Sequence, residues 1–356
     1  MNIKECVDHF IYHSPDFHED LEMLEIDAKH TNILTEAYKQ IKNGVAFSKS
    51  NFRTWKGQTD LATPTQLSLD AVRTQGLINL VVRYIYAKVF RRTEEKLLLS
   101  ALLDDIDIIK LLGGEKLLSE NPVHVTPGAE SFYHINGTSV NFRWLRYIYI
   151  LKRIIDQNLL SNGDIWVDVG SFYGGLQGLV RKHFPGARIV LVDFHHQLCR
   201  SFIYLSSQFP DAKHIMPDEL GNYRNLNDMQ EGAFMYLPVS DYGRIADQSV
   251  NLVTNYFSLG EMRREFYDTY MNSQLFKTSN IVYLVNRFVS APFFEKTYDT
   301  DINILDYKNL DRKVKYFDIF PMHHYLLINR IIFGRMSLRN VSSPYFEMLT
   351  TSVNKT

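Results

Sequence analysis

The feature that most constrains the fold is a stretch in which two short apolar runs flank a glycine-rich turn and a helix. It reads GDIWVDVGSFYGGLQGLVRKHFPGARIVLVDFHHQ and occupies residues 163–197. The runs at 165–169 and 187–193 are rich in β-branched residues, as the buried strands of a parallel sheet are. The sequence therefore predicts two parallel strands joined by a helix, with glycines where the first strand turns into the helix.

The same alternation of short apolar runs and helical stretches continues downstream. Besides the first two strands, the pattern predicts strands at 233–239, 250–257 and 280–286, helices at 197–209 and 262–276, and an inserted loop at 213–232. Short strands that alternate with helices indicate an α/β fold with helices on both faces of the sheet. We expect a doubly wound, Rossmann-like sheet.

The first third of the chain has a different texture. Its periodicity predicts helices at 18–44 and 93–113, each stopped by a glycine, and few strands. We therefore expect a mostly helical N-terminal region over 1–130, which would act as a lid, a substrate platform or a dimer surface. A catalytic domain is expected over 131–345, and the last residues, 346–356, are expected to form a flexible tail.

Composition excludes several classes of protein. Lysine and arginine (39) nearly balance aspartate and glutamate (40), so no basic field argues for nucleic acid as a partner. The two cysteines, Cys6 and Cys199, are too few for a disulfide framework or a four-cysteine zinc site, and the first residues lack the apolar core of a signal peptide. We expect a cytoplasmic protein without a transmembrane segment. Peripheral membrane contact and homo-oligomerisation stay open.

The glycine turn is expected to bind a nucleoside-containing cofactor. In an open parallel sheet, ligands collect beyond the carboxyl ends of the strands, where a helix begins. Gly170 and Gly174 allow a left-handed backbone and close approach of a ligand. Asp193 ends the second strand, where its carboxylate is placed to accept hydrogen bonds from two ribose hydroxyls. Phe194 is placed to cover an adenine ring.

The glycine spacing argues against a dinucleotide. The glycines at 170, 174, 175 and 178 do not fit the G-x-G-x-x-G fingerprint. The only Tyr-x-x-x-Lys, which runs from Tyr38 to Lys42, lies far upstream of the predicted sheet. An NAD-dependent sugar epimerase is thus a minor alternative.

With its acid two residues before the first glycine, the stretch resembles the first motif of class I S-adenosylmethionine-dependent methyltransferases. The resemblance implies S-adenosylmethionine as the cofactor and Asp168 as a partner of its methionine ammonium. It also implies cofactor contacts at the turn and at the end of the fourth strand, from Gly170, Ser171, Tyr173, Gly174 and Asn255. The chain departs from the family at Phe172, where a second glycine is common and where a bulky ring would narrow the pocket.

A second stretch, VNLVTNYFSLGEMRREFYDTYMNS (250–273), resembles a bacterial family of sugar O-methyltransferases. The letters that carry this resemblance are Asn255, Phe257, Ser258, Glu261 and Met262, and it extends over about 130–290. It implies transfer of a methyl group to a sugar hydroxyl in surface polysaccharide (O-antigen or capsule) biosynthesis. Whether the acceptor is a nucleotide-linked sugar, a lipid-linked glycan or a finished polymer stays open. The alternatives are another small acceptor, or a non-catalytic scaffold in a glycan-assembly complex.

A sugar hydroxyl is a poor nucleophile, so its methylation calls for a base that removes the proton. The predicted catalytic residues are Glu261, His323 and His324, and the predicted substrate-binding residues are Ser258, Tyr256 and Arg264. Ser258 and Glu261 also match a helix capping box, which needs no catalysis. No metal is expected, because no acidic or histidine cluster has a convincing ligand spacing.

Overall fold

The structure is a computed structural model of the 356-residue chain. It describes residues 2–17, 53, 96, 98–129, 132–289, 302–308, 311–323, 326–328, 338–340 and 345–353. The chain forms two compact units, one of Met1–Phe52, Arg153–Phe320 and Ser343–Thr356, the other of Arg53–Lys152 and Pro321–Ser342. This division differs from the predicted boundary at residue 130, because segments from both ends of the chain join the first unit.

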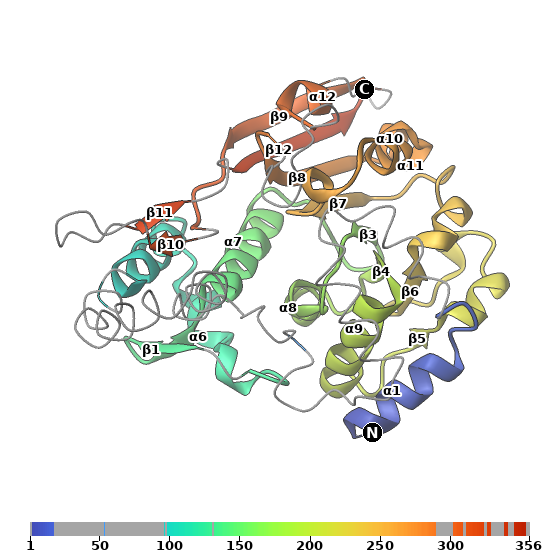
Figure 1. The fold of residues 1–356 in the computed structure, drawn as a ribbon, viewed down its shortest axis with the longest axis horizontal. Coiled ribbons are helices and arrows are strands. Elements are labelled where there is room, and N and C mark those ends of the chain that lie inside the picture. The colour runs from blue at the N-terminus through green and yellow to red at the C-terminus, as the bar shows by residue number, and fades with distance from the viewer. Residues whose placement is uncertain are drawn as a thin grey trace, which may run out of the picture. The chain divides into compact units, whose positions relative to one another are not determined.

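The first unit is built on an eight-stranded sheet in the order β5-β6-β4-β3-β7-β8-β12-β9 (Figure 1). The strands are β3 (Ile165–Val169), β4 (Arg188–Asp193), β5 (His214–Ile215), β6 (Phe234–Pro238), β7 (Leu252–Tyr256), β8 (Ile281–Arg287), β9 (Arg312–Ile319) and β12 (Tyr345–Ser352). The first six are parallel, whereas β12 runs antiparallel between β8 and β9. The expected Rossmann-like α/β fold is confirmed.

All five predicted strands are present, each within two residues of its predicted ends. Every residue of β3, β6 and β7 is buried. Strands with both faces covered cannot alternate apolar and polar residues, which is why each of them reads as a nearly continuous apolar run. The segment predicted as an inserted loop contains only the two-residue β5 and two short 3-10 helices, η2 (Pro217–Asn222) and η3 (Leu226–Asp228).

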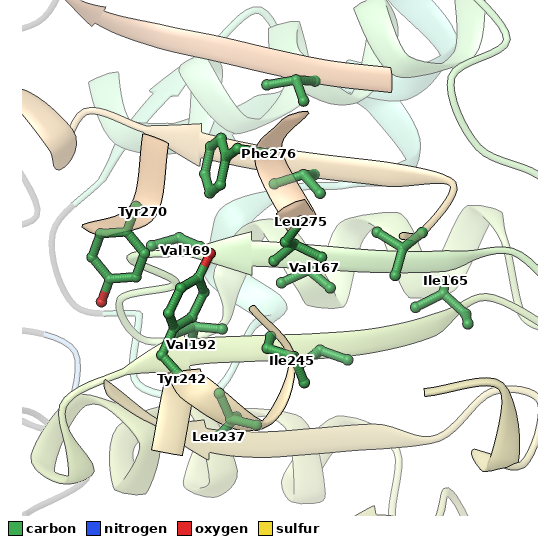
Figure 2. Packing of buried hydrophobic residues seen from close by; sticks show 14 of the residues in the cluster. Ile165, Val167, Val169, Val192, Leu237, Tyr242, Ile245, Tyr270, Leu275 and Phe276 are labelled. Atoms are coloured by element: carbon green, nitrogen blue, oxygen red, sulfur yellow. The ribbon is translucent and has the colours of Figure 1, made fainter. Parts of the chain in front are cut away.

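Helices cover the faces of the sheet. The predicted helix after β3 is α8 (Gly175–His183), and that after β4 is α9 (His195–Gln208). The helix predicted at 262–276 is divided into α10 (Arg264–Asn272) and α11 (Gln274–Thr278). The break falls at Ser273, whose hydroxyl caps α11 by accepting the Phe276 N–H. Figure 2 shows Tyr270, Leu275 and Phe276 packed over strand residues such as Val167.

The prediction of a flexible tail at 346–356 is wrong for its first seven residues. Tyr345–Ser352 forms β12, which pairs with β8 and β9 and is buried over its first six residues. The polar letters of this segment concealed a strand because Glu347 and Thr350 are buried with hydrogen-bond partners. The chain's last described residues are thus an interior strand of the sheet.

The remaining elements of the first unit are short. They are α1 (Ile3–Tyr12), η4 (Val239–Arg244), η5 (Leu259–Glu261) and α12 (Ile304–Lys308). The helix α1 begins with a capping box between Asn2 and Glu5 and packs against α9. The helix predicted at 18–44 lies outside the described residues.

The second unit is helical with two small hairpins. It contains α6 (Glu115–Glu120), η1 (Val123–Val125), β1 (Tyr133–Ile135) paired with β2 (Thr138–Val140), β10 (Leu326–Ile328) paired with β11 (Leu338–Asn340), and α7 (Phe142–Asp156) up to Lys152. Residues 98–111 are helical, and Gly113, in the turn that follows, adopts the left-handed conformation expected after a helix. In the described segments, no helix has both the length and the apolar character needed to cross a bilayer.

Candidate functional site

The order in which strands are added to the sheet reverses between β3 and β7. From β3 the chain adds β4, then β5 at the edge and β6 between β4 and β5, and it then returns to add β7 and β8 on the other side of β3. Ligands of open α/β sheets bind at such a switch point, beyond the carboxyl ends of the strands. The turns after β3, β4 and β7 therefore form the candidate site. Together with the ends of these strands, they hold all the residues predicted to bind cofactor or substrate or to act in catalysis except Arg264, His323 and His324.

The turns after β3 and β7 lie against each other at Gly170. This glycine has φ of +84°, and a Cβ placed on it would lie 2.2 Å from Ser258 Oγ. Its N–H donates to Val192 O at 2.8 Å, which fixes the turn to β4. Gly174 also has φ of +84°, and a Cβ there would contact Leu205 and Ser201 of α9. The first glycine thus admits a neighbouring turn, and the second admits a neighbouring helix.

Asp193 joins the ends of β4 and β3. Its Oδ2 accepts the Phe172 N–H at 2.8 Å, and its Oδ1 accepts the Phe194 N–H at 2.9 Å. The Ser201 hydroxyl donates to Phe172 O at 2.7 Å, so the peptide groups on both sides of Phe172 are held.

Two phenylalanines at the site have left-handed backbones. Phe172, in the turn after β3, has φ of +56°, and Phe257, directly after β7, has φ of +69°. Both rings are half-buried. Phe257 packs edge to face against Phe320 and Tyr345, with ring centroids 5.5 and 5.3 Å away. Left-handed residues other than glycine and asparagine are rare and strained, and such strain concentrates at functional sites.

Asp168 lies in a buried polar network. Its Oδ1 accepts from Thr254 Oγ1 at 2.5 Å, and its Oδ2 accepts from Gln177 Nε2. Trp166 Nε1 donates to Thr254 Oγ1 at 2.7 Å. Asp168 is 2% exposed and has no salt bridge within the described part of the chain. Burial, and secondarily the charge of Asp193, raises the pKa of Asp168 to about 8.

Asn255, at the end of β7, connects four segments. Its Nδ2 donates to Val169 O and to Ser258 Oγ, each at 2.6 Å. Its Oδ1 accepts from the Leu259 N–H and from Asn286 Nδ2, at 3.0 and 3.1 Å. The side chain is completely buried. Asn255 therefore builds the frame of the turn, and its predicted contact with a cofactor stays a prediction.

The capping box predicted for Ser258 and Glu261 does not form. The Ser258 side chain makes no cap hydrogen bond and instead accepts from Asn255. Glu261 ends the short η5, and its Oε1 accepts from Arg287 Nη2 at 2.9 Å. Arg287 is buried at the end of β8, and its Nε donates to Tyr345 Oη at 2.6 Å. A buried arginine holds the Glu261 carboxylate in place beside the ends of β7 and β8.

The other predicted site residues of the first unit are arranged less favourably for ligand contact. Tyr173 is 1% exposed and packs on Tyr204 of α9, and Tyr256 is 7% exposed and packs on Tyr283. Arg264 forms an ion pair with Asp306 of α12 at 2.7 Å.

Two residues of the β3 and β4 turns suit the predicted site better. Phe194 is half-buried and stacks on His196, and Ser171 is 4% exposed with a hydroxyl that has no hydrogen-bond partner.

Of the two predicted catalytic histidines, His323 lies in the second unit. His323 donates to the buried Asp105 through its backbone N–H at 3.0 Å and makes a 2.8 Å contact with the same carboxylate oxygen through Nδ1. The Asp105 contact raises the pKa of His323, while burial raises the pKa of Asp105 itself. His323 is therefore held against Asp105 within this unit. His324 lies outside the described residues, and the catalytic roles of both stay predictions.

Sequence reasoning missed the residues that hold the site together. Thr254 and Gln177 both contact Asp168 through buried polar atoms. The signal for Thr254 is its position inside the apolar run of β7, because a buried polar side chain needs a hydrogen-bond partner. In the described ranges, no three His, Cys, Asp or Glu side chains gather as ligands for a metal ion.

Comparison of the sequence with protein-family models finds no match, and comparison with curated proteins finds none either. Solved structures do align with the chain. The PH0226 protein of Pyrococcus horikoshii is 9% identical, covers 60% of this chain and 92% of its own, and has a TM-score of 0.38.

Two methyltransferases align over a similar share. Magnesium protoporphyrin IX methyltransferase from Synechocystis, solved with bound SAH, is 9% identical, with coverage of 60% and 88% and a TM-score of 0.37. An O-methyltransferase family 2 protein from Planctomyces limnophilus, in complex with apigenin, is 10% identical, with coverage of 61% and 64% and a TM-score of 0.32.

Proposed function

We propose that the protein is a methyltransferase that uses S-adenosylmethionine. The observation that carries this proposal is the position of Asp193 at the carboxyl end of β4, hydrogen-bonded to the left-handed turn that follows β3. A carboxylate there, beside the switch point of the sheet, is suited to the two hydroxyls of a ribose. Phe194, half-buried next to it, is suited to an adenine face.

The residues at the other end of the turn fit the amino-acid part of this cofactor. Asp168 is a buried carboxyl whose two hydrogen-bond donors, Thr254 and Gln177, are neutral. The buried Ser171 Oγ and Gln177 Oε1 have no hydrogen-bond partner. A buried carboxyl without a cation, next to unsatisfied polar atoms, is what an ammonium group would complete. Asp168 would hold the methionine ammonium, and the turn from Gly170 to Gly174 would enclose the methionine part of the cofactor.

The acceptor that we propose is a hydroxyl of a sugar destined for a surface polysaccharide. This part rests on the resemblance of residues 250–273 to bacterial sugar O-methyltransferases. When bound, the cofactor supplies an electrophilic methyl group on a sulfonium. The residues after β7 would orient the hydroxyl, and Glu261 would accept its proton. The Arg287 ion pair supports this role because it fixes the carboxylate in one position.

The experiment that tests the proposed function is methyl transfer from radiolabelled S-adenosylmethionine to glycan fractions of the host's own surface polysaccharide. We expect label in a base-stable sugar methyl ether, and at least tenfold less label with protein that carries Glu261→Gln. Label in a small aromatic acceptor, but in no glycan, would keep the methyltransferase and reject the sugar. Failure to bind the cofactor would leave the alternative of a non-catalytic scaffold.

A further inference from the structure

The buried contacts around Asp168 fix the direction of each hydrogen bond. The Trp166 indole can only donate, so Thr254 Oγ1 must accept from it. The single proton of the Thr254 hydroxyl is then directed at Asp168 Oδ1, 2.5 Å away. All three side chains are at most 2% exposed, so water does not compete for these bonds. Trp166 thus commits Thr254 to be a donor toward Asp168.

Gln177 is the second neighbour of the carboxyl and can act in either sense. Its Nε2 contacts Asp168 Oδ2, and its Oε1 is buried without a hydrogen-bond partner. A half-turn of the amide would bring Oε1 to the same carboxyl oxygen, where it would accept a proton from a neutral acid. Gln177 can therefore serve both the ionised and the protonated form of Asp168.

The charges that face Asp168 favour the protonated form in the absence of a cation. Asp193 on β4 repels a second negative charge at Asp168. The phenol of Tyr256 on β7 is neutral, because its burial, and to a smaller extent the charge of Asp168, raises its pKa well above the ordinary value. No salt bridge reaches Asp168 from the described segments. Burial and this repulsion raise the pKa of the carboxyl to about 8.

We propose that Thr254 and Gln177 are positioning residues that govern a proton exchange at Asp168: an ammonium-bearing ligand that binds there displaces one proton from the carboxyl. The carboxyl O–H bond breaks, the proton leaves to solvent, and the carboxylate that forms pairs with the ligand's ammonium. Thr254 stabilises the carboxylate by its fixed donor, and Gln177 stabilises it through Nε2, the orientation that the structure shows; only the protonated form requires the amide to be turned. The inference rests on the proposed function, because the methionine ammonium is the expected cation.

The direct test is calorimetric titration of the intact protein with S-adenosylhomocysteine in buffers of different ionisation enthalpy. At pH 7 we expect the wild type to release close to one proton on binding, and Asp168→Asn to release none. As pH increases toward about 8, the affinity of the wild type should rise by up to tenfold per pH unit, and above about pH 8 it should level off. This readout uses binding alone, so it does not depend on the acceptor or on turnover.

Variants of the positioning residues sharpen the test. Thr254→Val removes the fixed donor, so we expect the pH at which its affinity levels off to be at least half a unit higher than in the wild type. Thr254→Ser keeps the hydroxyl and should restore the wild-type dependence of affinity on pH. Gln177→Leu should shift the profile in the same direction. Thr269→Val, at an exposed position on α10, is the matched control and should leave the profile unchanged.

The outcomes separate the inference from the function on which it rests. Wild-type binding without proton release, and with an affinity independent of pH from 5.5 to 8, overturns the proton exchange and leaves the methyltransferase proposal intact. Proton release that persists in Asp168→Asn also overturns it. Folded wild-type protein that binds no S-adenosylhomocysteine at any pH overturns the proposed function itself.

Discussion

The Phe172 N–H donates a 2.8 Å hydrogen bond to Asp193 Oδ2, and this bond ties the end of β4 to the left-handed turn after β3. The carboxylate that we assign to the ribose thus also holds the backbone in a conformation that phenylalanine disfavours. A ligand that bonds to Asp193 would add to the forces that keep this turn in place. The same strain occurs across the switch point at Phe257, where it can be measured separately.

We predict that the free energy of unfolding of Phe257→Gly is higher than that of Phe257→Ala by about 1 kcal/mol. Both variants lose the ring, but only glycine adopts φ of +69° without steric cost. Urea unfolding followed by circular dichroism measures the difference. Thr269, exposed in the middle of α10, is the control, and there alanine should be the more stable by about the same amount. The same order at both positions would contradict strain at Phe257.

The raised pKa of Asp168 predicts how the unliganded protein's stability depends on pH. In the unfolded chain this carboxyl loses its proton near pH 4, whereas in the folded chain it does so at about 8. Between these values the folded state binds the extra proton, so the free energy of unfolding should fall as pH rises, by at most about 1.4 kcal/mol per unit. Above pH 8 this contribution stops changing.

Asp168→Asn removes the titrating group and retains an acceptor for Thr254, so we expect its stability to vary much less between pH 5 and 8. Urea unfolding of both proteins at matched pH values measures this. Parallel stability profiles for the two proteins would show that Asp168 is ionised throughout.

Glu261→Gln should lower methyl transfer at least tenfold while S-adenosylhomocysteine binds nearly as in the wild type. Glutamine can still accept the hydrogen bond from Arg287, so the substitution removes the base with little change in geometry. Initial rates with labelled cofactor measure the loss, and Glu265→Gln, exposed on the first turn of α10, is the control. Unchanged turnover in Glu261→Gln would reduce Glu261 to a partner of Arg287.

The His323 and Asp105 pair predicts a pH window for the second unit. The Asp105 contact raises the pKa of His323. The contribution of this pair to the free energy of unfolding is therefore fully present below the unfolded pKa of histidine, and it is lost as pH rises through the pKa in the folded state. Burial raises the pKa of Asp105, which sets the lower limit of the window. Asp105→Asn should cost roughly 2 kcal/mol near pH 6 and less at pH 9. A cost that is larger at pH 9 would contradict the ion pair.

The parallel core of the fold was predictable from the sequence because its strands are buried on both faces. Runs such as 165–169 and 187–193 leave few alternatives to a covered parallel strand. The antiparallel β12 was not predictable in the same way. Its Glu347 is buried only because Tyr283 and Arg153 bond to it, and both lie far away in the sequence.

The site was predictable as a location but not as a set of contacts. The sequence placed Asp168, Asp193 and Asn255 at strand ends, where the structure has them. It did not reveal that the Asn255 side chain hydrogen-bonds to the backbone of the neighbouring strand, or that Ser258 fills the space beside Gly170. Such details depend on which turns meet across the switch point, which local periodicity does not encode.

The most direct test of the central claim is calorimetric titration of the protein with S-adenosylhomocysteine, compared with Asp193→Ala. Asp211→Ala, an exposed carboxylate beyond the other end of α9, is the control, and circular dichroism checks that each variant is folded. We predict micromolar binding by the wild type and by Asp211→Ala, and at least tenfold weaker binding by Asp193→Ala. Absence of binding in all three, or equal affinity in folded Asp193→Ala, would contradict the claim that the ends of β3 and β4 hold this cofactor.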